Sequence, residues 1–402
     1  MAGISALGTN YNLPNYTGIL HALTPTETPF FSAIGGLSGG KQTTSTEFEW
    51  QTYDLRDAAQ PAIVEGADAP ALTGRARANV TNVVQIHQSA VGVAYSKLAA
   101  YGQKSGTNNA MQNPVIQELD WQVLRELEGM VRDINYSAIN GAYQKPSDNS
   151  TGRKTRGVLA AITTNAVLAD ETIVGNGDSL WEADDEVITE AAHGLAVGDR
   201  VRIAIDSGAT GATAGYFWVK TVPSSSTFTV STTKGGTTQA ITVDGVVDVY
   251  KQTALTIAKA NNFFQSIYDG GGLTSQETTV VLVNSGLKVE ISELYANAYG
   301  KFQETSRNVG GVNVNTIVTD FGTFGVMTDR MMPQGTLGVV DLAECAPVYL
   351  EIPDAENGGM KGHFFAEPLA KTGATDRTQL YGEFGLEYGN QLKHGKLEGL
   401  PY

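Results

Sequence analysis

The sequence predicts an α+β fold with a small all-β domain inserted into it. Three observations predict this class. Apolar residues recur at helical spacings between Pro114 and Ile139, alternating apolar and polar residues mark strands on both sides of that segment, and residues 166–252 consist of short alternating stretches. Glycine makes up 46 of the 402 residues, which is typical of many turns between strands.

Composition narrows the classes of function. The chain has 27 basic and 42 acidic residues, a net charge of −15, and such a chain repels nucleic-acid phosphate. Cys345 is the one cysteine, which excludes an internal disulfide and a cysteine-based zinc site. No apolar run approaches the roughly 20 residues that span a bilayer, and no lysine or arginine precedes Lys41 as in a secretory signal. We therefore expect no sequence-specific nucleic-acid binding, no membrane, no cofactor and no metal.

Residues 1–40 are predicted to form an arm. Within it, the stretch TPTETPFFSAIG covers Thr24–Gly35, and its two prolines should keep Thr24–Pro29 out of a helix. Phe30 and Phe31 need burial, because so short an arm cannot form a core of its own. We expect both rings to pack against the chain's own long helix or against the core of a neighbouring subunit.

Residues 41–95 are predicted to form a projecting β-ribbon. In TEFEWQTYDL, Phe48, Trp50 and Thr52 alternate with polar residues, which is the period of a half-buried strand. A second extended stretch covers residues 79–96, and the Gly/Ala/Pro-rich residues between the two form a pliant tip. An isolated two-stranded ribbon is marginally stable in water, so we expect this ribbon to need a partner.

A long helix is the clearest single prediction. Asn113 suits the cap and Pro114 the first helical position, and apolar residues then recur at spacings of three and four to about Ile139. At 1.5 Å per residue the helix would be about 40 Å long, which suits a structural beam.

Residues 166–252 differ in composition from the rest of the chain, with 5 basic and 12 acidic residues. Short alternating stretches predict five or six strands of a small barrel or sandwich, with Val201, Ile203 and Ile205 on its inner side. The predicted strands lie at residues 186–190, 199–205, 215–222, 226–233, 239–245 and 246–251.

The remaining segments complete the α+β prediction. Residues 253–345 contain a helix stopped by glycines near residue 270, a buried strand at 278–284, a helix from Ser285 and further strands. The stretch from Arg377 to Leu400 alternates and predicts one long strand.

Several motifs suggest chemistry, and each has a better structural explanation. Gly35–Lys41 nearly matches a phosphate loop, but Gln42 replaces the Ser or Thr that would bind Mg²⁺, so a glycine hinge is favoured. Gly208–Gly215 has the wrong spacing for a dinucleotide loop and is predicted to be a hairpin tip. Glu47 and Glu49 share one side of a strand, as glycosidase carboxylates could, yet an exposed ribbon face is the commoner arrangement.

Three other sequence features also have a better structural explanation. The acidic run at residues 184–186 lacks the spacing of a calcium loop and is predicted to be a solvated turn. Cys345 is predicted to be a small buried side chain. Arg153, Lys154 and Arg156 form the one compact basic cluster, which favours salt bridges to a neighbouring acidic face over a nucleic-acid or phosphate site. No enzyme constellation emerges.

The order of arm, ribbon, long helix, α+β domain and returning strand resembles the major capsid protein of tailed double-stranded DNA phages. The resemblance is carried by TPTETPFFSAIG, TEFEWQTYDL, GVMTDRMMP and the ending EPLAKTGATDRTQLYGEFGLEYGNQLKHGKLEGL. It implies the Hong Kong 97-like capsid fold. The implied parts are an N-terminal arm (1–40), an extended loop (41–95), a peripheral domain with its spine helix (96–165), an inserted β-domain (166–252), an axial domain (253–345) and peripheral return strands (346–402).

The resemblance also implies the function and the partners. The chain would form pentamers and hexamers of an icosahedral head that encloses double-stranded DNA, contacted non-specifically, in a virion assembled in the cytoplasm of a bacterial host. Because the sequence enters its arm at once, a separate scaffold protein is implied, together with a portal; a decoration protein is left open. Some relatives cross-link by a Lys–Asn isopeptide bond, but no lysine lies between Lys41 and Lys97 to supply it from the ribbon.

The residues expected to contact neighbouring subunits share a position in the arm, the ribbon or the basic cluster. They are Phe30, Phe31, Trp50, Arg56, Arg75, Arg77, Arg153 and Arg156. One alternative function is a phage surface or tail-associated adhesin that binds glycans through residues 166–252. A carbohydrate-active enzyme using Glu47 or Glu49 is the other.

Overall fold

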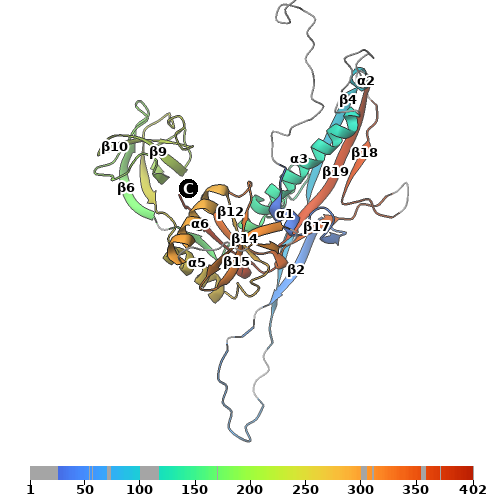
Figure 1. Cartoon of the computed structure of the whole chain (residues 1–402), viewed down its shortest axis with the longest axis horizontal. Coiled ribbons are helices and arrows are strands. Elements are labelled where there is room, and N and C mark those ends of the chain that lie inside the picture. The colour runs from blue at the N-terminus through green and yellow to red at the C-terminus, as the bar shows by residue number, and fades with distance from the viewer. Residues whose placement is uncertain are drawn as a thin grey trace, which may run out of the picture.

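The computed structural model describes residues 26–53, 55–56, 58–69, 74–99, 117–169, 171–299, 306–309, 312–354, 359–371 and 373–401. The described strands form a ribbon, a five-stranded sheet, a seven-stranded sheet and a closed barrel. Figure 1 shows the seven-stranded sheet with its helices at the centre, and the other three units project from it in different directions.

The five-stranded sheet carries the long helix α3 (Glu118–Asn140) along one face. Helix α3 buries the apolar residues of its C-terminal half, including Met130 and Ile134, against this sheet and the central unit. The predicted cap residues Asn113 and Pro114 lie outside the described residues, but Gln117 is extended and α3 begins at Glu118, so the predicted start of the helix is wrong. The strand order is β1 (Lys41–Thr43), β17 (Ala346–Leu350), β19 (Thr375–Glu387) and β18 (Phe364–Pro368), and β4 (Gln85–Ala94), which leads into helix α2 (Tyr95–Ala99), pairs with β19.

A short helix that the sequence did not predict forms in the arm. Helix α1 (Pro29–Ala33) begins at Pro29, whose fixed φ and missing N–H suit the first helical position. Phe30 and Phe31 are 0% and 1% exposed, and they share a hydrophobic cluster with Ile134 of α3. Their partner is thus the chain's own long helix, which was one of the two expected partners.

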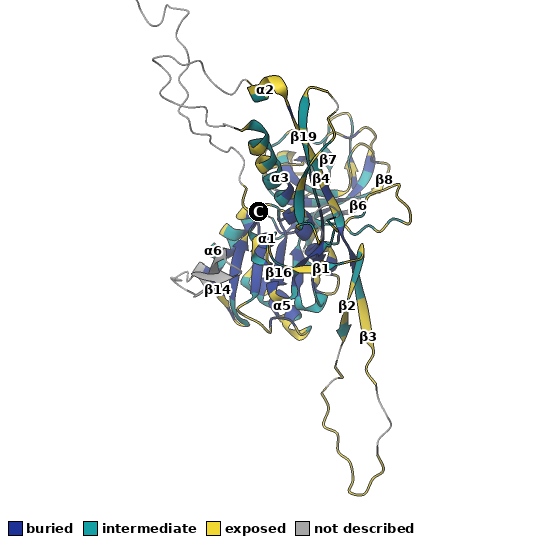
Figure 2. Cartoon of the chain, turned by 90° about the vertical axis from the view of Figure 1, so that its right-hand side faces the viewer, coloured by how far each residue is buried: buried dark blue, intermediate teal, exposed yellow. Residues whose placement is uncertain are grey.

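The ribbon consists of β2 (Glu47–Tyr53) and β3 (Arg77–Val83), paired antiparallel from Glu47↔Val83 to Tyr53↔Arg77. The second stretch, expected as one strand over 79–96, is divided at Val84: β3 pairs with β2, while β4 belongs to the five-stranded sheet. Figure 2 shows the ribbon largely exposed beside the buried central sheet.

The central strand of the seven-stranded sheet, β12 (Thr279–Val283), is buried on both faces. Val280 and Leu282 of this strand face the cluster that contains α3, whereas Val281 and Val283 face the cluster that contains α5 (Ile257–Asp269) and α6 (Ser285–Tyr299). The strand order is β13 (Ser306–Val309), β14 (Val312–Thr319), β15 (Gly322–Thr328), β12 (Thr279–Val283), β16 (Leu337–Asp341), β20 (Gly395–Glu398) and β5 (Ala166–Leu168). The helices are α4 (Val158–Ala161), α5 (Ile257–Asp269) and α6 (Ser285–Tyr299), with 3₁₀ turns at Leu342–Glu344 and Gln391–Lys393.

Two other predicted boundaries are wrong. The strand expected from Arg377 to Leu400 ends at Glu387, and the chain then turns back so that β20 joins the seven-stranded sheet. Residues 166–168, expected in the all-β unit, form β5 beside β20. Gly389, which has a φ of 58°, permits the turn that separates the two parts of the expected strand.

The barrel is closed by six strands and encloses Trp181 and Phe228, both 0% exposed. Sequence reasoning missed β6, because Gly175, Asn176 and Gly177 have low strand propensity. It also wrongly predicted a strand over 239–245, where an isolated bridge between Thr210 and Val243 forms instead. The strands are β6 (Glu171–Trp181), β7 (Ile188–Thr189), β8 (Arg200–Ser207), β9 (Gly215–Ser224), β10 (Thr227–Ser231) and β11 (Gly245–Gln252).

Candidate assembly surface at the ribbon

The base of the ribbon is held by aromatic side chains. Alternation along β2 points Phe48 and Trp50 toward the end of β19. Trp50 donates from Nε1 to the carbonyl of Gly389 at 2.8 Å, and its ring meets Tyr388 edge-on with 4.8 Å between centroids. Phe48 lies so close to Gly385 that a Cβ there would be 2.6 Å from its ring. These contacts fix the direction in which the ribbon leaves the sheet.

A buried amide joins the ribbon to the rest of the chain. Asn82 is 0% exposed, and its Nδ2 donates to the carbonyl of Leu386 at 2.7 Å and to that of Arg156 at 3.1 Å. Its Oδ1 accepts from the backbone N–H of Arg156 at 2.9 Å. One side chain therefore links three separate segments. The sequence contains a signal for this role, since Asn82 is an amide at an inward position between Val80 and Val84 of the alternating stretch.

Both arginines of the predicted basic cluster bind within the chain. Arg153 forms a salt bridge with Glu383 at 2.9 Å and donates to the carbonyl of Val84 at 3.2 Å. Arg156 donates to the hydroxyl of Tyr388 at 3.0 Å, and its guanidinium lies over the ring of Tyr143. The structure thus places these two arginines at the foot of the ribbon.

The outer part of the ribbon is exposed and partly apolar. Leu55 is 74% exposed, Ile63 65% and Val64 82%. Arg56, Arg75 and Arg77, three of the predicted contact residues, are also exposed along this region. Apolar side chains of this size rarely remain in water without a partner when they gather in one segment.

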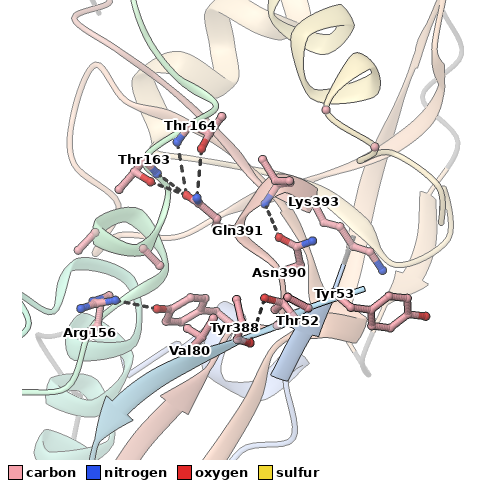
Figure 3. Close-up of a pocket in the computed structure, with 18 residues that line it drawn as sticks. Thr52, Tyr53, Val80, Arg156, Thr163, Thr164, Tyr388, Asn390, Gln391 and Lys393 are labelled. Carbon is pink, nitrogen blue, oxygen red and sulfur yellow. Dashed lines mark hydrogen bonds between the residues drawn. The ribbon is translucent and has the colours of Figure 1, made fainter. Parts of the chain in front are cut away.

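A cleft of about 870 Å³ lies at the base of the ribbon, between β2, β3, α4 and the turn after β19. Figure 3 shows Thr163, Thr164 and Gln391 together on one wall and Arg156 reaching Tyr388 on another. Gln391 accepts from Thr163 Oγ1 at 2.6 Å and donates to Thr164 Oγ1 at 3.1 Å. The polar groups of these walls are bonded to one another rather than aimed into the cleft.

The other sequence motifs show no chemistry in the described residues. No helix follows Gly35–Lys41, and Lys41 pairs with Glu387 at 2.7 Å. Glu47 pairs with Lys145 at 2.6 Å, whereas Glu49 accepts from Asn79 at 3.3 Å. Cys345 is buried, and this burial raises the pKa of its thiol.

The described residues contain neither a metal-ligating cluster nor a membrane-spanning helix. No group of three or more His, Cys, Asp or Glu side chains in that part of the chain could hold a metal ion. Among the described helices, none is long and apolar enough to cross a membrane.

Comparisons with known proteins point to one family. A family model described as "SU10 major capsid protein" matches residues 3–401. Among solved structures, the capsid asymmetric unit of cyanophage A-1(L) has a TM-score of 0.52 and 12% identity, over 99% of this chain and 100% of that chain. The holo-SrpI encapsulin complex from Synechococcus elongatus has a TM-score of 0.47 and 10% identity, over 100% and 97% of the chains. A comparison with curated proteins finds no match.

Proposed function

Since the chain belongs to the SU10 major capsid protein family, which matches residues 3–401, we propose that it self-assembles into the shell of an icosahedral phage head. Family membership makes it a structural capsid protein of the virion and not an enzyme. The expected Hong Kong 97-like fold is confirmed by the family match and by the likeness to the cyanophage capsid. The adhesin alternative has no support in these matches.

The finer parts of the proposal follow the family's architecture. The shell would consist of pentamers and hexamers, would enclose double-stranded DNA without sequence preference, and would assemble in the host cytoplasm with a scaffold protein and a portal. The five-stranded sheet with helix α3 would be the peripheral domain, and the seven-stranded sheet would be the axial domain. The barrel would be an insertion into the minimal fold. The net charge of −15 supports a shell that does not trap the genome by attraction.

The observation that carries the proposal is the ribbon, which is fixed at its base and apolar at its exposed end. Each large aliphatic side chain buried on a neighbour would contribute roughly 1.5–3 kcal/mol. Leu55, Ile63 and Val64 are the candidates, and the exposed Arg75 and Arg77 would pair with a neighbour's acidic surface.

The other predicted contact residues take a different role in this proposal. Phe30, Phe31, Trp50, Arg153 and Arg156 all have partners inside the chain. We propose that they set the position of the arm and the ribbon, and that they leave direct contact with a neighbour to the outer part of the ribbon.

Deletion of residues 58–77 tests the role of the ribbon. The shortened chain should keep its far-ultraviolet circular dichroism, because the removed residues contribute little to the buried clusters. Sedimentation and electron microscopy, with the scaffold protein present, should show no shells. Normal shells from this variant would contradict the proposal.

Two point variants test whether the ribbon acts through contacts of its apolar end rather than through its length. Val64→Asp places a charge on the exposed end of the ribbon and should raise the protein concentration needed for assembly at least tenfold. Val197→Asp makes the same change at a valine of the barrel region that is 67% exposed, and should raise this concentration far less. Equal effects of the two variants would mean that the ribbon has no special part in assembly.

A further inference from the structure

The two connections between the barrel and the rest of the chain lie next to each other. The chain enters the barrel at Glu171, the first residue of β6, and residues 253–256 lead out of β11. Glu171 and Gln252, the barrel residues at these two connections, are paired across β6 and β11. Two connections that leave from adjacent positions act as a single hinge, so the linkers alone would let the barrel turn against the seven-stranded sheet.

A buried arginine crosses this junction. Arg200 of β8 is 8% exposed, and its Nη1 donates to the carbonyl of Leu400 at 2.7 Å. Leu400 is itself 0% exposed, belongs to the cluster of α5 and α6, and donates its backbone N–H to the carbonyl of Gly335 at 3.0 Å. A hydrogen bond from a charged donor is roughly twice as strong as a neutral one, and here it lies out of water.

The fit around Arg200 is close on both sides. On the central unit, a Cβ on Gly335 would lie 2.2 Å from Arg200 Nη1 and 2.4 Å from the Leu400 carbonyl. On the barrel, the guanidinium lies 4.9 Å from the ring centroid of Tyr216 and 5.7 Å from that of Trp218. The guanidinium therefore fills the space between barrel aromatics and a backbone turn that has room only for glycine.

Two further contacts extend the junction. A Cβ on Gly399 would lie 2.8 Å from Gln252 Oε1 and 3.2 Å from the hydroxyl of Tyr216. Figure 1 shows the C-terminal end of the chain where the barrel meets the central unit.

We propose that Arg200, Gly335 and Gly399–Leu400 form a clasp that locks the barrel in one orientation on the seven-stranded sheet. The barrel would then be a rigid part of the subunit rather than a tethered module. In a shell, every copy would hold its barrel in the same position relative to the ring of seven-stranded sheets. Arg200 is a positioning residue in this scheme.

Hydrogen exchange of the full-length, unassembled chain tests the clasp. Arg200→Ala should speed amide exchange at Gly399–Leu400 by about 10- to 100-fold, as expected for the loss of one buried hydrogen bond to a charged group. Proteolytic cleavage within residues 253–256 should accelerate as well. The matched control is Lys251→Ala, which removes a salt bridge of 2.6 Å to Asp199 inside the barrel region and should change neither readout.

A second variant keeps the test decisive if Arg200→Ala unfolds the barrel. Gly335→Ala leaves the barrel sequence intact and inserts a methyl group between Arg200 and Leu400, so the same acceleration is expected. Its control is Gly271→Ala, which has a comparable positive φ of 87° but nothing within 4 Å of the added Cβ. Unchanged exchange at Gly399–Leu400 in the Gly335 variant would overturn the clasp. Because the chain is unassembled, the result does not depend on shell formation.

Discussion

His87 lies in β4 with its imidazole between the rings of Phe364 and Phe384, whose centroids are 6.5 and 6.3 Å away. The residue is 8% exposed, and burial lowers its pKa from 6.5 to about 4. Its Nε2 has no hydrogen-bond partner among the described residues. The folded chain therefore holds His87 neutral at a pH where the unfolded chain would protonate it.

This shift predicts acid sensitivity with a definite sign. Between pH 6.5 and pH 4 the unfolded state binds more protons at His87, so the free energy of unfolding falls as the pH falls through this window. A shift of this size is worth about 2 kcal/mol between pH 7 and pH 5. His87→Phe should therefore lose about 2 kcal/mol less stability over that range than the parent chain, measured by denaturant unfolding of unassembled protein. Equal losses in the two proteins would show that His87 does not titrate in this way.

The extended stretch divides into β3 and β4, and because of this division the ribbon projects from the five-stranded sheet. At Val84 the chain exchanges its partner β2 for β19, and Asn82 supplies the hydrogen bonds that hold the crossing point. The backbone of Leu386 and Arg156 would be left with unsatisfied polar groups if this amide were absent. Such groups are costly when buried.

Asn82→Ala should accordingly lower the free energy of unfolding by about 2–4 kcal/mol. Asn79→Ala is the matched control on the same strand, because Asn79 is exposed and makes one side-chain bond of 3.3 Å to Glu49. It should change stability by less than about 0.5 kcal/mol. Denaturant unfolding measures both. A loss of equal size in the two variants would mean that strand propensity, and not the buried amide, is responsible.

Periodicity in the sequence was enough to predict some elements and not others. The alternation around Trp50 and Phe384 predicted β2 and β19, and the helical spacing of Met130 and Ile134 predicted α3. Helix α1 is too short to show a period and depends on the pocket that receives Phe30 and Phe31. Strand β20 was missed because the alternation continues through the turn at Gly389, where only tertiary pairing shows the change of sheet.

The candidate assembly surface was predicted in part. Exposure of Arg56, Arg75 and Arg77 agrees with their expected place in the ribbon, although contact with a neighbour stays a prediction. Sequence reasoning missed the roles of Asn82 and Gly389, because hydrogen bonds such as Asn82 to Leu386 join residues 304 positions apart. Single-sequence patterns report which side of a strand is buried, but they do not report which distant segment covers it.

The net negative charge of the whole subunit affects its assembly. Each copy carries a net charge of −15, so copies brought into a shell repel one another. Raising the salt concentration from 0.1 M to 1 M shortens the Debye length from about 10 Å to about 3 Å. Assembly followed by light scattering should therefore begin at a lower protein concentration in 1 M salt.

A charge-reduced variant checks this explanation. Asp184→Asn combined with Asp185→Asn removes two exposed negative charges from the barrel region and should weaken the dependence on salt. If high salt instead raised the concentration needed for assembly, attraction between opposite charges on neighbouring copies would dominate over net repulsion.

The two ends of the bond from Arg200 to Leu400 are 200 positions apart in the chain. At a synthesis rate of about 5–20 residues per second, the ribosome makes Leu400 roughly 10–40 s after Arg200. All six barrel strands lie within residues 171–252, so the barrel can close during this delay. Its orientation relative to the seven-stranded sheet would not yet be fixed at that time. If the clasp fixes the barrel as proposed, a nascent subunit would have a folded barrel whose orientation is not yet set, and a chaperone or neighbour that bound then would meet a shape different from that of the finished protein.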